Sequence, residues 1–115
     1  MKRVLVVDDE FELASSVEAI LEDEGFIVKS AGDGLEAFDL LQTEEFDLVI
    51  SDVMMPRCDG YQLLEKIRKE KKVKGIPVIL MSAAQLKTIK VKPDNFLKKP
   101  FDIDTLIQAV EKCIK

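Results

Sequence analysis

The sequence predicts one α/β domain built on a parallel sheet, with helices on both faces of that sheet. Short apolar runs of strand length alternate with segments in which apolar residues recur at helical spacing. The first run, residues 4–7, is continuously apolar, which is typical of a strand buried on both faces. Polar side chains, several of them acidic, stand where the strand patterns end. We therefore expect a doubly wound (βα)5 domain over residues 1–115 with strand order 2-1-3-4-5.

The first half of the chain alternates between the two patterns without interruption. The first helix pattern ends at Gly25, a typical helix stop. A turn with two glycines, residues 32–34, separates the second strand from the second helix. The expected elements are a strand at 4–7, a helix around 13–21, a strand at 27–31, a helix around 37–41 and a strand at 48–50.

The second half begins with a loop at residues 54–59, which contains Pro56. Pro77 leads into an apolar strand, and Asp102 is a suitable N-cap for the last helix, whose apolar residues form a stripe. The expected elements are a helix from about 59 to 67, a strand at 78–81, a strand centred on 96–97 and a helix at 103–114.

The crossover between the fourth and fifth strands is unusually short. Only residues 83–94 are available for it, which is close to the minimum for a parallel crossover with its helix. Residues 89–92 alternate as a strand does, and Pro93 interrupts a helix. We therefore expect a fourth helix of about two turns or less, or an irregular segment.

The composition excludes several classes of protein. The 115 residues carry a net charge of −5, which argues against direct binding of nucleic acid, because such binding normally needs a basic patch. No apolar run approaches the roughly 20 residues of a membrane span, and we expect a cytoplasmic protein. The chain has no histidine, which excludes histidine-based catalysis. Cys58 and Cys113 lack metal-binding or redox spacing and are expected to be reduced thiols.

The polar residues at the strand ends are predicted to form one pocket. In a parallel α/β sheet, the carboxyl ends of the strands share one edge, and ligands bind in the crevice there. The residues that end or follow the first, third, fourth and fifth strands are Asp8 and Asp9, Asp52, Ser82, and Lys99. Three acids and one cation would therefore converge.

This combination suits transfer of a phosphoryl group to a carboxylate. An Asp carboxylate can attack phosphorus to form an acyl phosphate once a cation offsets the repulsion between the two anions. Mg²⁺ prefers oxygen ligands, which the acids of the pocket and the backbone carbonyl of Met54 would supply. Lys99 would neutralise one phosphoryl oxygen, and the Ser82 hydroxyl would donate to another.

Five short motifs, taken together and in order, resemble the response regulator receiver domain along the whole chain. They are Val-Val-Asp-Asp-Glu at 6–10, Ser-Asp-Val-Met-Met-Pro at 51–56, Asp-Gly at 59–60, Met-Ser-Ala at 81–83 and Lys-Lys-Pro-Phe at 98–101. The resemblance implies a flavodoxin-like fold with Mg²⁺ as cofactor. It makes Asp52 the phosphoacceptor, and Asp8 and Asp9 the acidic pair for the metal, with Asp9 more directly involved.

The same resemblance assigns roles near the last two strands. Lys99 would contact the phosphoryl group, and Ser82 would be the switch hydroxyl. Phe96 falls where the family has its rotating aromatic residue. The bond before Pro100 is often cis in this family, which gives Pro100 a structural role.

By resemblance, the protein is a phosphorylation-dependent switch of a two-component system. A histidine kinase or phosphotransfer protein would supply the phosphoryl group, and the domain would assist its own phosphorylation and dephosphorylation without being a free-standing enzyme. We expect a monomer or weak dimer that binds neither membrane nor nucleic acid directly. The sequence names neither the kinase nor the output partner or domain.

Several alternatives stay open. Glu10 is either turned toward the metal or solvated in the first helical turn, and Phe96 is either a switch or a core aromatic. Asp33 and Asp59 are better explained as turn and cap residues. An interaction module that is not phosphorylated is the alternative function. A haloacid-dehalogenase-like phosphatase fits less well, because Asp52 is not followed by a second acid in an Asp-x-Asp pattern.

Overall fold

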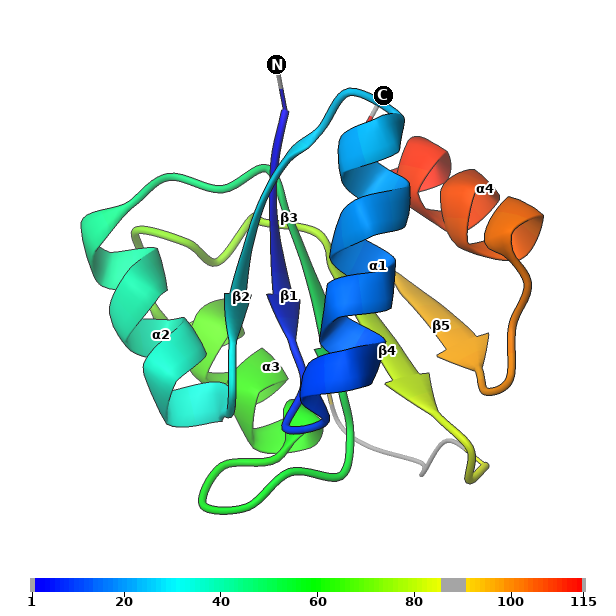
Figure 1. Cartoon of the computed structure of the whole chain (residues 1–115). Coiled ribbons are helices and arrows are strands. Elements are labelled where there is room, and N and C mark those ends of the chain that lie inside the picture. The colour runs from blue at the N-terminus through cyan, green and yellow to red at the C-terminus, as the bar shows by residue number, and fades with distance from the viewer. Residues whose placement is uncertain (1, 86–90, 115) are drawn as a thin grey trace.

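The structure is a computed structural model that describes residues 2–85 and 91–114 (Figure 1). Five parallel strands form one sheet in the order β2-β1-β3-β4-β5, which confirms the predicted order. The strands are β1 (Arg3–Val7), β2 (Ile27–Ala31), β3 (Leu48–Asp52), β4 (Val78–Ser82) and β5 (Asn95–Lys98).

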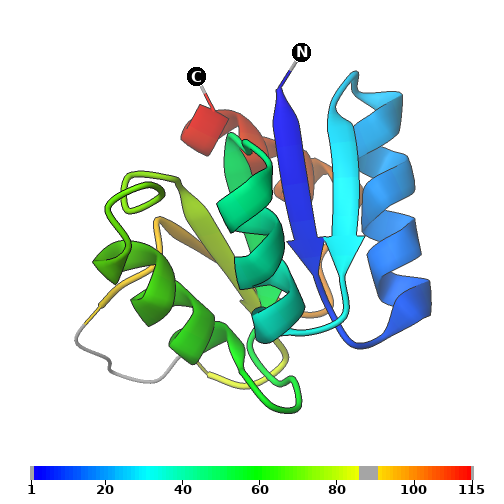
Figure 2. The same cartoon turned by 90° about the vertical axis from the view of Figure 1, so that its left-hand side faces the viewer.

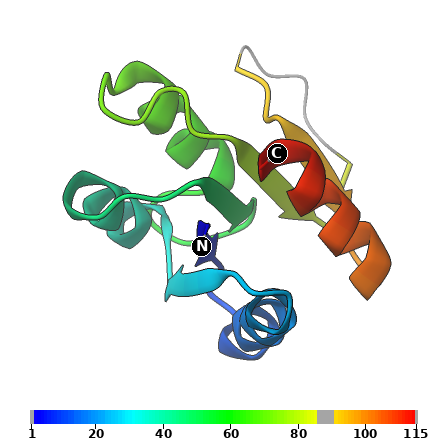
Figure 3. The ribbon, with the colours of Figure 1, turned by 90° about the horizontal axis from the view of Figure 1, so that it is seen from above.

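Two pairs of helices cover the two faces of the sheet (Figure 3). The helices of the described residues are α1 (Phe11–Asp23), α2 (Gly34–Thr43), α3 (Gly60–Lys69) and α4 (Ile103–Ile114). In Figure 2, α2 and α3 lie side by side on one face, while α1 and α4 cover the other. In the part of the chain that the structure describes, no helix is long and apolar enough to cross a membrane.

The continuous apolar run of β1 is explained by these two covered faces. Val4 and Val6 point into the core beneath α1 and α4, whereas Leu5 and Val7 point into the core beneath α2 and α3. All four side chains are fully buried. Successive side chains of a strand alternate between faces, so a strand with helices on both sides needs apolar residues at every position.

The crossover between β4 and β5 is irregular where it is described. Residues 83–85 and 91–94 contain neither helix nor strand. Residues 86–90 lie outside the described residues, and with them most of the predicted short helix and part of the strand-like pattern at 89–92. The described residues contain four helices, and neither the predicted short helix between β4 and β5 nor its alternative, an irregular segment, is tested over residues 86–90.

Three acidic residues that stand before helices act as caps. Asp33 accepts a hydrogen bond from the Glu36 backbone N–H at 2.9 Å, as the first residue before α2. Asp59 forms a capping box with Gln62 at the start of α3. Asp102 accepts from the backbone N–H of Thr105, as expected of an N-cap. The prediction that Asp33 and Asp59 are turn and cap residues is confirmed.

Gly60 lies so close to the end of β3 that a larger residue cannot fit without movement of the backbone. A Cβ atom at Gly60 would lie 2.5 Å from the Asp52 carbonyl oxygen and 2.9 Å from the Val53 Cα. We expect Gly60→Ala to lower the free energy of unfolding by roughly 2–3 kcal/mol, because overpacking against backbone cannot be relieved by a side-chain rotation. Urea denaturation measures this change. Gly75→Ala is the control, since a Cβ there meets nothing within 4 Å. Equal stability of the two variants would contradict the expectation.

Candidate functional site

The carboxyl edge of the sheet gathers the predicted polar residues. Asp52 is the last residue of β3 and Ser82 the last of β4, while Asp8 and Lys99 directly follow β1 and β5. Parallel register brings these ends level, and the Lys99 backbone N–H donates to the Ser82 carbonyl at 2.9 Å. Asp8, Asp52 and Ser82 are each no more than 5% exposed. In Figure 1 the strands point toward this lower edge of the sheet.

Lys99 contacts two of the acids. Its Nζ lies 2.9 Å from Asp52 Oδ1 and 3.6 Å from Asp8 Oδ2. Burial by itself would lower the pKa of Lys99, but the hydrogen bond to Asp52 and the charges of Asp52, Asp8 and Glu10 outweigh it and raise that pKa. Lys99 therefore stays an ammonium ion and presents a fixed positive charge beside Asp52.

Three carboxylates form what we call the acid cluster. Oxygens of Asp8, Glu10 and Asp52 all lie within 4.8 Å of one another. Asp8 Oδ1 accepts from the Glu10 backbone N–H at 2.9 Å, whereas the buried Asp8 Oδ2 accepts no hydrogen bond from the described residues. Burial raises the pKa of Asp8, the Glu10 N–H opposes this, and the Asp52 charge adds to it.

The acid cluster has the donor set that suits a hard divalent cation. Three carboxylates face one ammonium group, so negative charge is in excess, and the buried Asp8 Oδ2 accepts no hydrogen bond from the described residues. Oxygen ligands of this kind, completed by water and carbonyl groups, are those that Mg²⁺ prefers. The residues present therefore fit a magnesium ion.

The structure distinguishes residues that the sequence grouped together. Glu10, whose role was open, belongs to the acid cluster, and its position directly after the acidic pair was the available signal. Asp9 is exposed and is not a member of that cluster. Met54 lies in the loop after β3 with its side chain 72% exposed. The metal-binding roles of Asp9 and of the Met54 carbonyl stay predictions.

The residues expected to act as a switch lie beside the pocket. Ser82 Oγ accepts from the Ala84 backbone N–H at 3.0 Å. Phe96, in β5, is half-buried and packs against the core beneath α2 and α3. The peptide bond between Lys99 and Pro100 is cis, as the resemblance implied. Movement of Ser82 or Phe96 stays a prediction.

Apolar side chains are exposed at the start of two helices, and others line a hollow beside Lys99. Phe11, at the start of α1, is 82% exposed, and Ile103, at the start of α4, is 55% exposed. An open hollow of about 370 Å³ lies beside Lys99, and it is lined by Leu13, Ala83, Lys99, Pro100 and Phe101. The charged pocket therefore opens onto a surface with apolar patches.

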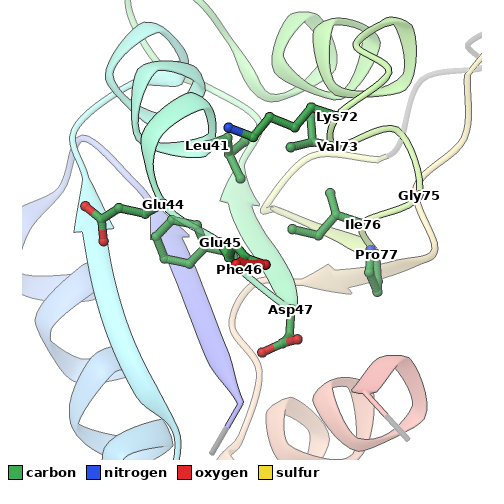
Figure 4. A pocket seen from close by; sticks show the side chains of 10 residues that line it. All are labelled: Leu41, Glu44, Glu45, Phe46, Asp47, Lys72, Val73, Gly75, Ile76 and Pro77. Atoms are coloured by element: carbon green, nitrogen blue, oxygen red, sulfur yellow. The ribbon is translucent and has the colours of Figure 1, made fainter.

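A second hollow, of about 350 Å³, lies at the opposite edge of the sheet (Figure 4). One of its charged residues, Glu44, forms ion pairs with Arg3 at 2.7 Å and with Lys29 at 2.9 Å. The Arg3 guanidinium also lies over the Phe46 ring, 5.2 Å from its centroid. These contacts join β1, β2 and the α2–β3 connection, so we assign this hollow no chemical role.

Comparison with known proteins agrees with the geometry. The family model of the response regulator receiver domain matches residues 4–111. The response regulator Rre1 of Synechocystis sp. is 43% identical over 117 residues, which cover 96% of this chain and 51% of the relative. The probable transcriptional regulator ycf29 of Porphyra purpurea is 40% identical over 116 residues, which cover 96% of this chain and 56% of the relative.

A solved structure shares the whole fold. The chemotaxis response regulator CheY4 of Vibrio cholerae matches with a TM-score of 0.90 and 31% identity, covering 98% of both chains. The chain spans about half the length of the curated relatives described above. With a family match over nearly all its residues and the same sheet order, the chain belongs to the response regulator receiver domain family of two-component systems.

Proposed function

We propose that this receiver domain is a phosphorylation-dependent signalling switch, with Asp52 as the phosphoacceptor. The observation that supports this most directly is the placement of the Asp52 carboxylate, which is buried, 2.9 Å from Lys99 and within the acid cluster. A carboxylate in this setting has a fixed cation 2.9 Å away and two further carboxylates beside it. Positioning and electrostatics are what phosphoryl transfer mainly requires.

The proposed reaction forms one bond and breaks one. An oxygen of Asp52 attacks the phosphorus of a phosphohistidine, the P–N bond breaks, and the imidazole leaves and takes up a proton from water. Lys99 neutralises a phosphoryl oxygen, and the Ser82 hydroxyl donates to another. Hydrolysis of the resulting acyl phosphate returns the carboxylate, and the domain assists both steps without being a free-standing enzyme.

Mg²⁺ is the proposed cofactor. Asp8 and Asp52 would hold it, with either Asp9 or Glu10 and the backbone carbonyl of Met54 as further oxygen donors. When bound, the ion supplies charge neutralisation between the two anions that must meet.

We propose a histidine kinase or phosphotransfer protein as the donor. Its phosphohistidine must come within bonding distance of Asp52, so the donor has to cover the carboxyl edge of the sheet, next to the mainly apolar hollow beside Lys99. Residues 1–115 would act as one domain, in the cytoplasm, as a monomer or weak dimer. We propose that the output passes through a partner or a further domain, without direct binding of nucleic acid by this domain.

Intact mass spectrometry after incubation with acetyl phosphate tests the proposal. We expect a gain of one phosphoryl group that requires Mg²⁺ and is removed by hydroxylamine, as an acyl phosphate is. Borohydride reduction followed by peptide mapping should place the label at Asp52. If no phosphoryl group is gained while calorimetry still detects Mg²⁺ binding, the proposal is wrong, and an unphosphorylated interaction module becomes the better description.

A further inference from the structure

The loop that carries Met54, residues 53–59, is attached to the start of α2. The guanidinium of Arg57 forms an ion pair with the Asp33 carboxylate, and its Nε donates to Asp33 Oδ2 at 2.9 Å. A second contact runs beside it, because the Gly34 backbone N–H donates to the Cys58 carbonyl at 3.2 Å. The loop and the helix N-terminus are therefore joined by a side-chain contact and a backbone contact.

The backbone of Arg57 shows that this attachment shapes the loop. Its φ of 63° is left-handed, a conformation uncommon for residues other than glycine. The side chain reaches Asp33, which is only 6% exposed. Asp33 is also held by the Glu36 N–H, and this bond and then Arg57 lower the Asp33 pKa, so the carboxylate stays charged. The left-handed backbone and the ion pair with Asp33 thus occur at the same residue of the loop.

The loop and the start of α2 pack closely against each other. A Cβ atom at Gly34 would lie 2.5 Å from Cys58 Sγ and 2.7 Å from the Cys58 carbonyl oxygen. At the other end of the loop, the Gly60 N–H donates to the Val53 carbonyl at 2.9 Å. Both ends of the segment that carries Met54 are thus fixed, one of them through Arg57.

We propose that Arg57 is a positioning residue for the metal site. Through Asp33, it fixes the loop so that the Met54 carbonyl faces the acid cluster. This inference rests on the proposed function, because it assumes that Mg²⁺ binds there. Coupling between two contacts is reciprocal, so bound Mg²⁺ should in turn protect the contact between the loop and α2.

Calorimetric titration with Mg²⁺ tests this in a double-mutant cycle of Arg57→Ala and Asp33→Asn. We expect each single variant to weaken Mg²⁺ binding by up to roughly fivefold, because a partly exposed ion pair contributes at most about a fivefold effect. The double variant should bind no more weakly than either single variant, because both changes remove the same contact. Lys29→Ala is the control, since it removes an ion pair with Glu44 far from the site and should leave the affinity unchanged.

The outcomes separate this inference from the proposed function. Four results would each overturn the role of Arg57. They are unchanged Mg²⁺ affinity in Arg57→Ala, fully additive effects of the two substitutions, an equal loss of affinity in Lys29→Ala, and no Mg²⁺ binding by the unmodified chain. Measuring the phosphoryl mass gain on the same samples tests the proposed function separately from the role of Arg57. Wild-type Mg²⁺ binding that depends on Arg57, without any phosphorylation, would contradict the proposed function alone.

Discussion

Replacing Asp52 by Asn is expected to abolish Mg²⁺-dependent phosphorylation while the fold is retained. The amide lacks the anionic oxygen that attacks phosphorus, and loss of a covalent nucleophile lowers a rate by at least roughly 1,000-fold. The amide has nearly the shape of the carboxylate, and it removes one of three like charges of the acid cluster. The same change removes the charged partner of Lys99 at 2.9 Å, so the two effects oppose each other and the free energy of unfolding should change by no more than about 1 kcal/mol.

Two measurements check this expectation. Intact mass after incubation with acetyl phosphate and Mg²⁺ should show no phosphoryl gain in Asp52→Asn, and urea denaturation should show a free energy of unfolding within about 1 kcal/mol of the wild type. Asp39→Asn, an exposed residue of α2, is the matched control and should be phosphorylated as the wild type is. A phosphoryl group gained at the usual rate by Asp52→Asn would mean that another residue is the acceptor.

The sheet and most of the pocket could be predicted because both depend on strand ends. A continuous apolar run such as β3 marks a strand with two covered faces, and its last residue then lies at the ligand edge of the sheet. Asp52, Ser82 and Lys99 follow from that rule alone, and the structure brings them together. No side-chain geometry was needed for this step.

The difference between neighbouring acids could not be predicted in this way. Asp8 is buried, Asp9 is exposed, and Glu10 returns to the acid cluster. These three residues lie between β1 and α1, where the twofold alternation of a strand has ended and the helical period has not begun. The directions of their side chains depend on the conformation of this turn, which no periodic pattern in the sequence predicts.

The contact between Arg57 and Asp33 was also beyond sequence reasoning. The two residues are 24 positions apart, and their pairing depends on how the β3–α3 loop lies against α2. The left-handed backbone of Arg57 gave no signal either, because glycine and asparagine are the residues that normally mark such positions. A contact between two segments without regular periodicity cannot be predicted from the residue pattern of either segment.

Asp8→Asn is expected to make the protein more stable without Mg²⁺ and less able to bind it. In the absence of metal, the Asp8 carboxylate is buried and lies beside the charges of Asp52 and Glu10, which the Glu10 backbone N–H and Lys99 offset only in part. Removing this charge should raise the free energy of unfolding by about 1 kcal/mol. Loss of an anionic oxygen donor should weaken Mg²⁺ binding by roughly 10- to 100-fold.

The pH dependence of stability isolates the charge of Asp8. Its pKa in the folded state is raised above the ordinary value of 3.8, mainly by burial, so in this range the folded state holds the proton more firmly than the unfolded state. The loss of stability that the Asp8 charge causes is therefore absent below pH 3.8. It develops as the pH rises from there through the raised folded pKa, and it is complete above that pKa. With EDTA present, the stability advantage of Asp8→Asn over the wild type should grow across that window and then stay constant.

Substitutions of the two neighbouring acids, Asp9 and Glu10, are the controls for Asp8→Asn. Asp9→Asn should leave metal-free stability unchanged because Asp9 is exposed, whereas Glu10→Gln should raise it slightly by removing a charge from the acid cluster. Calorimetry with Mg²⁺ then shows which of the two donates to the metal, since only that variant should lose affinity as Asp8→Asn does. A wild type that is more stable than Asp8→Asn at neutral pH in EDTA would show that Lys99 more than compensates the buried charge. The excess negative charge at this sheet edge would then be no driving force for metal binding.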